Sequence, residues 1–212
     1  MPPPSIAQIL QDEILSGALP PGTPLSQADL AMRFGVSRIP IRDALAKLSA
    51  TGLITASPNR TATVLKMTRD EVIEAYNLRL LLEGDLLARA IPQMTDSHLS
   101  AIGYALERSS LEARQSNWAE GDRMFHDAIY AAAGQPRQQA MVNDLRRICC
   151  IQIAGYNQLT RNTDRWLTDH QRLTNACRAG NLRRATRILR RHLNGARNHL
   201  LREMDRKTTR PA

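Results

Sequence analysis

Apolar residues recur every three or four positions along almost the whole chain, which is the period of an amphipathic α-helix. The first helix predicted in this way has an apolar stripe of Ile6, Leu10 and Ile14 and ends at Gly17. The next residues, ALPPGTPL, are rich in proline and glycine and are therefore expected to form a connector made of turns. Only 4% of the residues are aromatic, which disfavours an all-β protein. The pattern predicts a mainly α fold.

Residues 26–65 predict two more helices and a short β-hairpin. The helices are expected over 26–35 and 37–52, because each begins at a serine that can cap its N-terminus and ends at a glycine. Two strand-like segments, 53–56 and 62–65, flank the turn-forming sequence SPNRT. Helix, glycine turn, helix and hairpin in this order predict an N-terminal winged helix-turn-helix.

The remainder of the chain is predicted to be helical throughout. Thr68 opens a new helix with a capping sequence, and no strand pattern returns after it. We therefore expect a DNA-binding domain over residues 1–67 and an all-helical, antiparallel bundle of about six helices over residues 68–212. The helices are expected at residues 69–91, 96–116, 118–133, 136–158, 163–179 and 181–206.

The second helix of a helix-turn-helix inserts its N-terminal end into the major groove of DNA. The residues at that end are Ser37, Arg38, Pro40 and Arg42. Arginine can form paired hydrogen bonds with guanine or charge-assisted bonds with phosphate, and Ser37 can offer its hydroxyl group to a phosphate. An arbitrary pair of arginines would more simply form a solvated helix face. The order of the surrounding elements favours contact with DNA.

The stretch LSQADLAMRFGVSRIPIRDALAKLSATGLI resembles the DNA-binding domain of GntR-family bacterial transcription regulators, whose pattern includes GVSR-x-P-x-R-x-AL. The resemblance covers about residues 5–66 and implies binding of a dimer to a short palindromic operator in double-stranded DNA. It implies that Arg38 and Arg42 are the principal contacts and that the wing, with Arg60, touches the minor groove. Related sequences usually place a glycine where this chain has Thr61. Because a β-branched residue resists positive φ, we expect a different shape at the wing tip.

Histidines are rare in the chain, and three of the five lie on or near apolar faces of predicted helices. Asp122 and His126 are four residues apart and therefore share one helix face. His170 and His192 lie on the last two predicted helices, and side chains from three helices can meet at the centre of a bundle. Three nitrogens and one carboxylate oxygen would suit zinc, nickel, manganese or iron. The spacing alone leaves a metal site and unconnected histidines equally open.

Residues 68–212 are similar to the all-helical ligand-binding domain, called FCD, of the fatty-acid-regulator (FadR) branch of the same family. Six helices rather than seven indicate the subgroup of the vanillate regulators (VanR). The matching sequences are RLLLE from Arg79, DRMFH from Asp122, HQRL from His170, GNLRRA from Gly180 and the following His192.

This second resemblance implies a bound divalent metal, whose open coordination positions are taken by water or by a small carboxylate effector. Arg79 is a candidate for pairing with an anionic effector, because the guanidinium group matches a carboxylate. A structural salt bridge between Arg79 and Glu83 is an equally good interpretation. The metal ligands implied by the resemblance are Asp122, His126, His170 and His192.

The formal net charge of +9 suggests an anionic partner, but the charge is concentrated away from the helix-turn-helix. Residues 1–67 contain six basic and four acidic residues, whereas residues 68–212 contain 23 and 16. Eleven basic and two acidic residues lie between Arg178 and Arg210. Such a run is most simply a solvated helix face. The alternatives are additional phosphate contacts or salt bridges to the DNA-binding domain.

Two other classes of function are compatible with parts of the pattern. The adjacent His126 and Asp127 would suit a metal-dependent hydrolase of the HD type. However, Asp127 points about 100° away from His126 around the helix, and Asp169 is expected on the wrong face to act as a general base. A DNA-binding architectural protein, in which the helical domain only dimerises, is the other alternative.

We therefore expect a DNA-binding transcription regulator that is not an enzyme, that forms a homodimer and that acts as a repressor. No segment resembles a signal peptide or a membrane span. Three cysteines, two of them adjacent, fit reduced thiols better than disulfides. A cytoplasmic location, at the nucleoid when the protein is bound to DNA, is expected.

Overall fold

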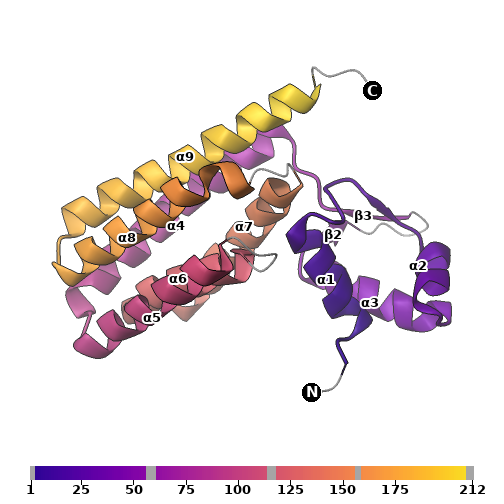
Figure 1. The fold of residues 1–212 in the computed structure, drawn as a ribbon, viewed down its shortest axis with the longest axis horizontal. Helices are drawn as coiled ribbons and strands as arrows, with labels where there is room; N and C mark the ends of the chain where they lie inside the picture. The colour runs from indigo at the N-terminus through magenta and orange to yellow at the C-terminus, as the bar shows by residue number, and fades with distance from the viewer. Residues whose placement is uncertain (1–2, 56–60, 114–117, 156–158, 209–212) are drawn as a thin grey trace. The chain divides into compact units, whose positions relative to one another are not determined.

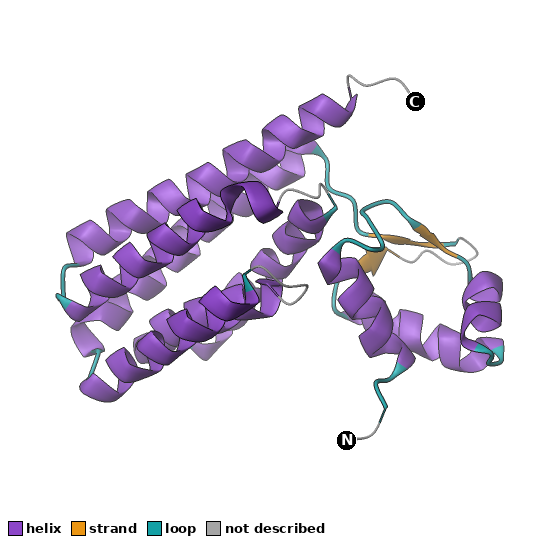
Figure 2. Cartoon of the chain, in the orientation of Figure 1, coloured by secondary structure: helices purple, strands orange, loops and turns teal. Residues whose placement is uncertain are grey.

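The protein is described by a computed structural model (Figure 1) in which α-helices predominate (Figure 2). Its contacts divide the chain into two compact units, which we describe separately. The first unit contains the chain up to Met67 and the second half of helix α7 (Pro136–Ala154), from Arg147 onward. The second unit contains the first half of α7 and the other helices that follow Thr68. The described residues are 3–55, 61–113, 118–155 and 159–208.

The first unit is a winged helix-turn-helix, as predicted. The hydroxyl group of Ser26 caps helix α2 by accepting a hydrogen bond from the Asp29 N–H at 3.4 Å, and Gly35 ends the helix with a φ of 65°. Ser37 occupies the N-cap position of α3 without a side-chain hydrogen bond to the helix. Its hydroxyl group is therefore available at the helix start. The elements are α1 (Ile6–Ser16), β1 (Pro24–Leu25), α2 (Gln27–Phe34), α3 (Arg38–Ala50), β2 (Ile54–Thr55) and β3 (Ala62–Val64).

The wing contains one more strand than the sequence predicts. Strand β3 pairs antiparallel with β2 and also with β1, which gives the order β1-β3-β2. Leu25 lies opposite Ala62 in this sheet, and Ile54 lies opposite Val64. The prediction of a connector without a strand was therefore wrong at Pro24. A two-residue strand is too short to show alternation, and proline is tolerated in it because it lies at the edge of the sheet.

Helix α7 contributes to the core of the first unit. Ile151 is fully buried in a cluster with Leu10, Ile41 and other apolar residues of α1, α3 and the sheet. The Gln152 side chain accepts a hydrogen bond from the Met67 N–H at 3.2 Å, and its amide group donates one to a backbone carbonyl of the wing at 3.0 Å. The sequence analysis assigned all of α7 to the helical domain. By its contacts, the second half of α7 belongs with the winged helix-turn-helix.

The second unit consists of helices that lie along one another (Figure 1). Helix α5 packs on α6, and α9 packs on both α4 and α8. The predicted breaks at Pro92, Gly134 and Gly180 are present, and both glycines have positive φ. The prediction of a mainly α fold with about six helices here is confirmed for the described residues. Their bounds are α4 (Arg69–Ala90), α5 (Asp96–Glu112), α6 (Trp118–Tyr130), α7, α8 (Leu159–Arg178) and α9 (Leu182–Thr208).

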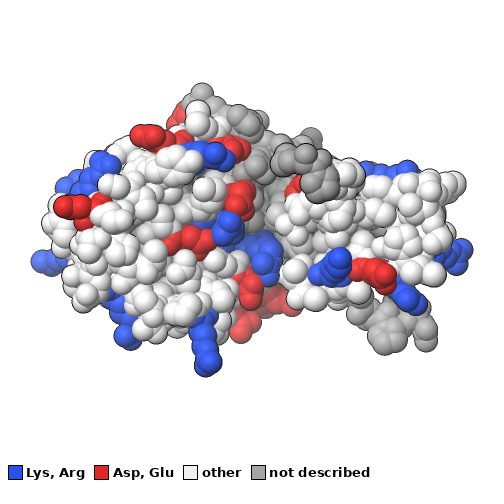
Figure 3. Space-filling model, turned by 90° about the horizontal axis from the view of Figure 1, so that it is seen from below, with Lys and Arg blue, Asp and Glu red and all other residues white. Residues whose placement is uncertain are grey.

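Charged side chains of both signs lie on the face of the protein drawn in Figure 3. On the face drawn in Figure 3, basic and acidic groups are interspersed and do not form one continuous basic surface. In the arginine-rich helix α9, Arg191 donates to Asp169 at 2.6 Å and Arg206 donates to Glu203 at 2.7 Å. Part of the basic run is therefore engaged within the second unit. Among the described residues, no helix combines the length and the apolar character needed to cross a membrane.

Candidate metal centre

Four side chains from three helices of the second unit converge at one buried point. Helix α6 supplies Asp122 and His126, which share a face because they are four residues apart. Helix α8 supplies His170 and helix α9 supplies His192. One ligand atom from each residue lies within 4.8 Å of the others, and all four residues are buried. The sequence-predicted ligand set is thus assembled in space.

Each of the three imidazole rings has its Nδ1 atom turned toward a polar neighbour. The Nε2 atoms of His126 and His170 then face the Oδ1 atom of Asp122. The distance to Oδ1 is 3.7 Å from His126 and 3.6 Å from His170. The Nδ1 atoms lie 3.3 Å from the Tyr130 hydroxyl group in His126, 3.5 Å from the Ser109 hydroxyl group in His170 and 3.8 Å from the Asp169 carboxylate in His192.

The atoms that face the centre of the cluster are not satisfied within the protein. Asp122 Oδ1, His126 Nε2 and His170 Nε2 are buried and have no hydrogen-bond partner among the described residues. Each such atom costs about 1–3 kcal/mol when it is left unpaired. A cation bound between them would satisfy all three atoms at once. Imidazoles held at one nitrogen by a polar neighbour are the usual arrangement around a protein-bound metal.

Burial keeps these histidines neutral. Loss of solvation lowers the pKa of His126 well below its ordinary value of 6.5, and the charge of Arg146 lowers it further. The pKa of His170 is lowered in the same way, by burial and by the neighbouring His192 and Arg146. A neutral imidazole has the free electron pair that coordination requires. The cluster is therefore prepared for a metal at neutral pH.

A buried arginine that the sequence analysis did not identify lies beside the cluster. Arg146 of α7 forms an ion pair with Asp122 Oδ2 and donates to Glu83 Oε2 at 3.0 Å. Glu83 also accepts hydrogen bonds from Arg79 and Tyr130, each at 2.7 Å. Burial raises the pKa of Glu83, but Arg79 and Arg146 outweigh this effect and hold it below its ordinary value. Two arginines and two carboxylates thus balance their charges in the interior.

The sequence contains a weak signal for the role of Arg146. Arg146 and Arg147 are adjacent and look equivalent, but Arg146 follows the buried Val142 by one helical turn and precedes the buried Cys150 by another. It therefore lies on the inward face of α7. Arg146 is 3% exposed, whereas Arg147 donates to the Thr51 carbonyl in the first unit.

Aromatic side chains close the cluster on one side. The ring of Phe125 stacks on that of His170 with centroids 4.0 Å apart and an interplanar angle of 19°. Trp166 covers another side of the same imidazole, with centroids 4.1 Å apart. These contacts exclude solvent from His170 and fix its ring, which contributes to the low pKa described above.

The DNA-contacting residues expected from the sequence lie at the start of α3. Ser37, Arg38 and Arg42 are exposed, and Pro40 is half-buried in the first turn of the helix. Arg42 Nε lies 3.9 Å from the Asp43 carboxylate, and both side chains are exposed. The positions agree with the sequence analysis, but their contacts with DNA remain a prediction. Arg60 lies outside the described residues.

Comparison with known proteins decides the family of the chain. Residues 4–64 match the family described as bacterial regulatory proteins, gntR family, and residues 74–195 match the FCD domain. The chain belongs to the gntR family.

The similarity of this gntR-family chain to curated proteins is moderate. It is 33% identical over 127 residues to the HTH-type transcriptional repressor RspR of Escherichia coli K12, covering 58% of this chain and 56% of that protein. It is 30% identical over 146 residues to the gluconate operon transcriptional repressor of Bacillus subtilis 168, covering 68% of this chain and 60% of that protein. The matches therefore span little more than half the length of these relatives.

Solved structures share the architecture of this gntR-family chain over nearly its whole length. A transcriptional regulator GntR from Rhodococcus sp. RHA1 superposes with a TM-score of 0.78 at 25% identity and covers 92% of this chain and 95% of its own. E. coli McbR/YncC superposes with a TM-score of 0.76 at 20% identity, covering 93% and 96%. The second likeness shows the fold alone.

The remaining predicted residues fall into two groups in this gntR-family chain. Arg79 is buried and forms an ion pair with Glu83, as the interpretation of a structural salt bridge requires. It also lies over the Tyr76 ring. A role for Arg79 in binding an effector stays a prediction. Asp127 points away from the cluster, since its carboxylate accepts hydrogen bonds from Gln139 at 3.0 Å and Asn143 at 2.8 Å. The His-Asp pair of a hydrolase is therefore not assembled at this site.

Asp169 lies next to the cluster without joining it. It was expected on the wrong face of its helix to join the site as a base. The structure places it beside His192, on the outer side of that ring. Asp169 is thus a neighbour of His192 and not a member of the four-residue cluster, a relationship that helix periodicity within α8 alone does not reveal.

Proposed function

We propose that this gntR-family protein is a DNA-binding transcription regulator, a homodimeric repressor whose operator affinity responds to a small carboxylate. The observation that carries the proposal is the convergence of three buried ligand atoms without hydrogen-bond partners, described above for Asp122, His126 and His170. A helical domain that served only for dimerisation would have no use for such an unsatisfied interior, since each unpaired atom destabilises it.

The residues that would hold the metal provide three imidazole nitrogens and one carboxylate oxygen. This donor set fits zinc, nickel, manganese or iron in the divalent state. When bound, the ion would supply positively charged coordination positions that a carboxylate can occupy. The outer neighbours of the histidines would keep the rings in orientation. The proposed ligands are Asp122, His126, His170 and His192.

The charge balance of the interior supports an anionic effector. Arg79 and Arg146 neutralise Glu83 and Asp122, and burial keeps His126 and His170 uncharged. A divalent ion would therefore bring two uncompensated positive charges into a buried site, which is unfavourable. A carboxylate ligand would reduce this excess. Arg79 stands beside the cluster as a further group that could pair with the effector.

The response would pass through Asp122 and Arg146. One oxygen of Asp122 faces the cluster, while the other is held by Arg146 on α7. A ligand that shifts Asp122 would change this ion pair and so the position of α7. The residues of α7 that follow Arg146 form part of the core of the winged helix-turn-helix. The protein would then have two conformations, which differ in the position of α7 and therefore in operator affinity.

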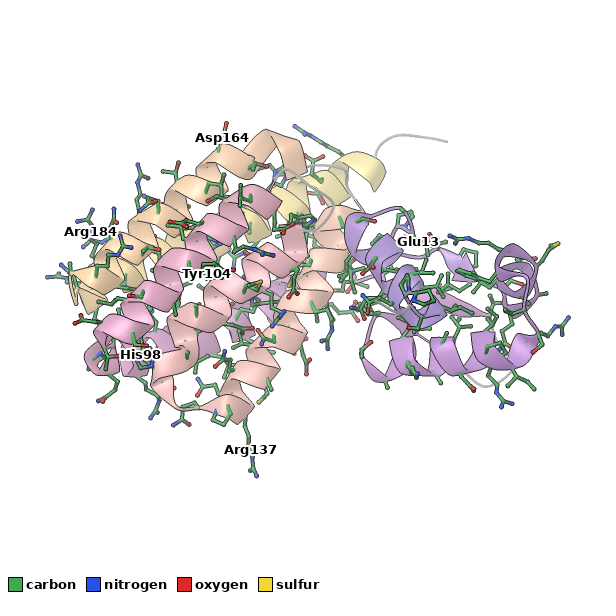
Figure 4. All side chains as sticks on the ribbon, turned by 60° about the horizontal axis from the view of Figure 1, so that its bottom comes forward. Glu13, His98, Tyr104, Arg137, Asp164 and Arg184 are labelled. Atoms are coloured by element: carbon green, nitrogen blue, oxygen red, sulfur yellow. The ribbon has the colours of Figure 1, made fainter. Side chains whose placement is uncertain are left out.

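Metal analysis and DNA binding test the proposal together. We expect the purified protein to contain about one divalent metal per chain and to bind an operator selected from its genomic DNA. The variant carrying His126→Ala and His170→Ala should lose the metal and should no longer respond to any member of a panel of small carboxylates. His98→Ala is the matched control, because His98 lies outside the cluster, at the start of α5, where its ring contacts Thr95 (Figure 4).

Two results would contradict the proposal in different ways. Metal-free protein with unchanged operator affinity and an unchanged carboxylate response would leave the helical domain with a dimerisation role only. Protein that selects no DNA would contradict the regulator function itself. Thermal denaturation in the presence of each carboxylate, with and without a chelator, identifies which acids depend on the metal.

A further inference from the structure

The apolar side chains exposed on the first unit are gathered at one place. Among its described residues, the large apolar side chains that are exposed are Met32, Val36 and Ile39. They fall within eight consecutive residues, from the end of α2 to the first turn of α3. Single apolar residues on a surface need no explanation. Three of them around the turn of a helix-turn-helix form a local apolar surface at the part of the motif that meets DNA.

Ile39 has the position on this surface that points directly away from the core. The buried face of α3 is formed by Ile41, Ala44, Leu45 and Leu48. Ile39 precedes Ile41 by two residues, which turns it by about 200° around the helix. Its side chain is 63% exposed. It therefore lies at the centre of the outward face, and the expected DNA contacts Arg38 and Arg42 lie together on one side of it.

The acidic side chain on the same face indicates that this face meets the base edges of DNA and not the phosphates. Asp43 follows Ile39 by one helical turn and is exposed. A carboxylate placed against the phosphate backbone would be repelled, whereas at the base edges it can accept a hydrogen bond from cytosine. Ala46, a further turn along, is small and exposed and allows close approach. The outward face of α3 is thus suited to the floor of the major groove.

We infer that Ile39 determines specificity by contacting the C5-methyl group of a thymine in each operator half-site. The methyl group of thymine is the apolar group that the major groove presents to a protein. An aliphatic side chain excludes water from it, and the two arginines beside Ile39 bind guanine or phosphate. The inference rests on the DNA-binding function proposed above and assigns one base to a residue that forms no hydrogen bond through its side chain.

Thymine and deoxyuridine differ only in this methyl group and therefore provide the test. The full-length protein first selects its operator from a randomised DNA library. Each thymine of the selected half-site is then replaced in turn by deoxyuridine, and the Kd is measured by electrophoretic mobility shift. We expect one position at which the replacement weakens binding about fourfold per methyl group, the equivalent of ~0.8 kcal/mol for one buried carbon.

The variant Ile39→Ala should bind the thymine and deoxyuridine operators with equal affinity at that position. Its discrimination at other thymines should be unchanged. Leu111→Ala is the matched control, since Leu111 is an equally exposed leucine on α5 and should leave the thymine preference intact. Unchanged thermal denaturation of the Ile39 variant shows that its fold is preserved.

Four outcomes overturn the inference. If the wild-type protein selects DNA but does not discriminate deoxyuridine at any position, or if the discrimination survives in Ile39→Ala, then Ile39 does not read a methyl group. If Ile39→Ala instead reduces self-association in the absence of DNA, then the apolar surface is an interface between copies of the chain. If the wild-type protein selects no DNA, the proposed function fails and the inference fails with it.

Discussion

The Oδ2 atom of Asp169 lies 3.8 Å from Nδ1 of His192, on the side of this imidazole that faces away from the cluster. Arg191 fixes the carboxylate in turn by donating to its other oxygen at 2.6 Å. Although burial raises the pKa of Asp169, the contacts with His192 and Arg191 hold it below its ordinary value. Asp169 is therefore an anion that orients the His192 ring toward the cluster.

Replacement of Asp169 by asparagine should weaken metal binding without removing a ligand. The substitution keeps the size of the side chain but removes the charge behind His192, and loss of such a neighbour typically costs about 10–100-fold in metal affinity. Isothermal titration calorimetry with zinc and nickel measures the change. Asp127→Asn is the control, since Asp127 faces away from the cluster. Equal affinities of the two variants would contradict the role of Asp169.

Gly121 should not tolerate a side chain. A Cβ atom at this position would lie 2.9 Å from Cβ of Glu112 and 3.1 Å from Cα of Ser109, so α5 and α6 would have to separate. We expect Gly121→Ala to lower the free energy of unfolding by about 1–3 kcal/mol. Metal affinity should fall as well, because Ser109 and Asp122 would be displaced. Urea denaturation and calorimetry measure the two effects.

Gly84 provides the matched control for Gly121. It also lies within a helix, but a Cβ atom there would meet no atom within 4 Å. Because alanine favours a helix over glycine, Gly84→Ala should raise the free energy of unfolding by up to about 1 kcal/mol. Similar losses in both variants would show that the close approach of α5 and α6 has no special importance.

The stability of the metal-free protein should decrease as the pH falls below the ordinary histidine pKa of 6.5. In the unfolded chain His126 and His170 take up protons in this range, whereas in the folded protein burial keeps their pKa well below 6.5. The unfolded state then binds more protons, so acidification favours it. We expect a loss of roughly 1 kcal/mol per pH unit for each histidine between about pH 6.5 and 5.5.

Urea denaturation of chelator-treated protein at pH 7.5 and pH 5.5 measures this dependence. The variant with His126→Gln and His170→Gln should have a flatter profile than the wild type. A wild-type free energy of unfolding that is equal at the two pH values would show that the buried histidines are not held neutral.

Replacement of Arg42 should affect DNA binding alone. Arg42→Ala removes a group that can form paired hydrogen bonds with guanine, so we expect a loss of about 10–100-fold in operator affinity and relaxed sequence selectivity. Its metal content should be unchanged. Arg137→Ala is the control, because Arg137 extends away from the helical unit (Figure 4). Loss of metal together with DNA binding in Arg42→Ala would indicate a disturbed fold.

The fold could be predicted well because its boundaries depend on local chemistry. Ser26 and Thr68 cap their helices with hydrogen bonds to the third residue that follows, and Gly134 and Gly180 end helical segments with positive φ. These signals are present in short stretches of sequence. The pairing of β1 with β3 depends on residues about forty positions apart, so the strand at Pro24 left no local signal.

The candidate site was only partly predictable for the same reason. Asp122 and His126 share a face through helical periodicity, which the sequence reveals directly. The partners that hold the site, Arg146 and Asp169, act on side chains of other helices. Their roles depend on how α6, α7, α8 and α9 pack, and no spacing within a single helix encodes this. The four clustered residues could be named from the sequence and the family resemblance, whereas the contacts that support them required the structure.

The contact between Trp166 and His170 provides an intrinsic fluorescence reporter of the buried cluster. The chain contains two tryptophans, and the indole of Trp166 lies against an imidazole of the cluster. Indole emission is sensitive to charge and to heavy ions in its immediate surroundings. The intrinsic fluorescence of Trp166 should therefore change when the chemical state of His170 changes, so that occupancy can be followed in real time and without a label.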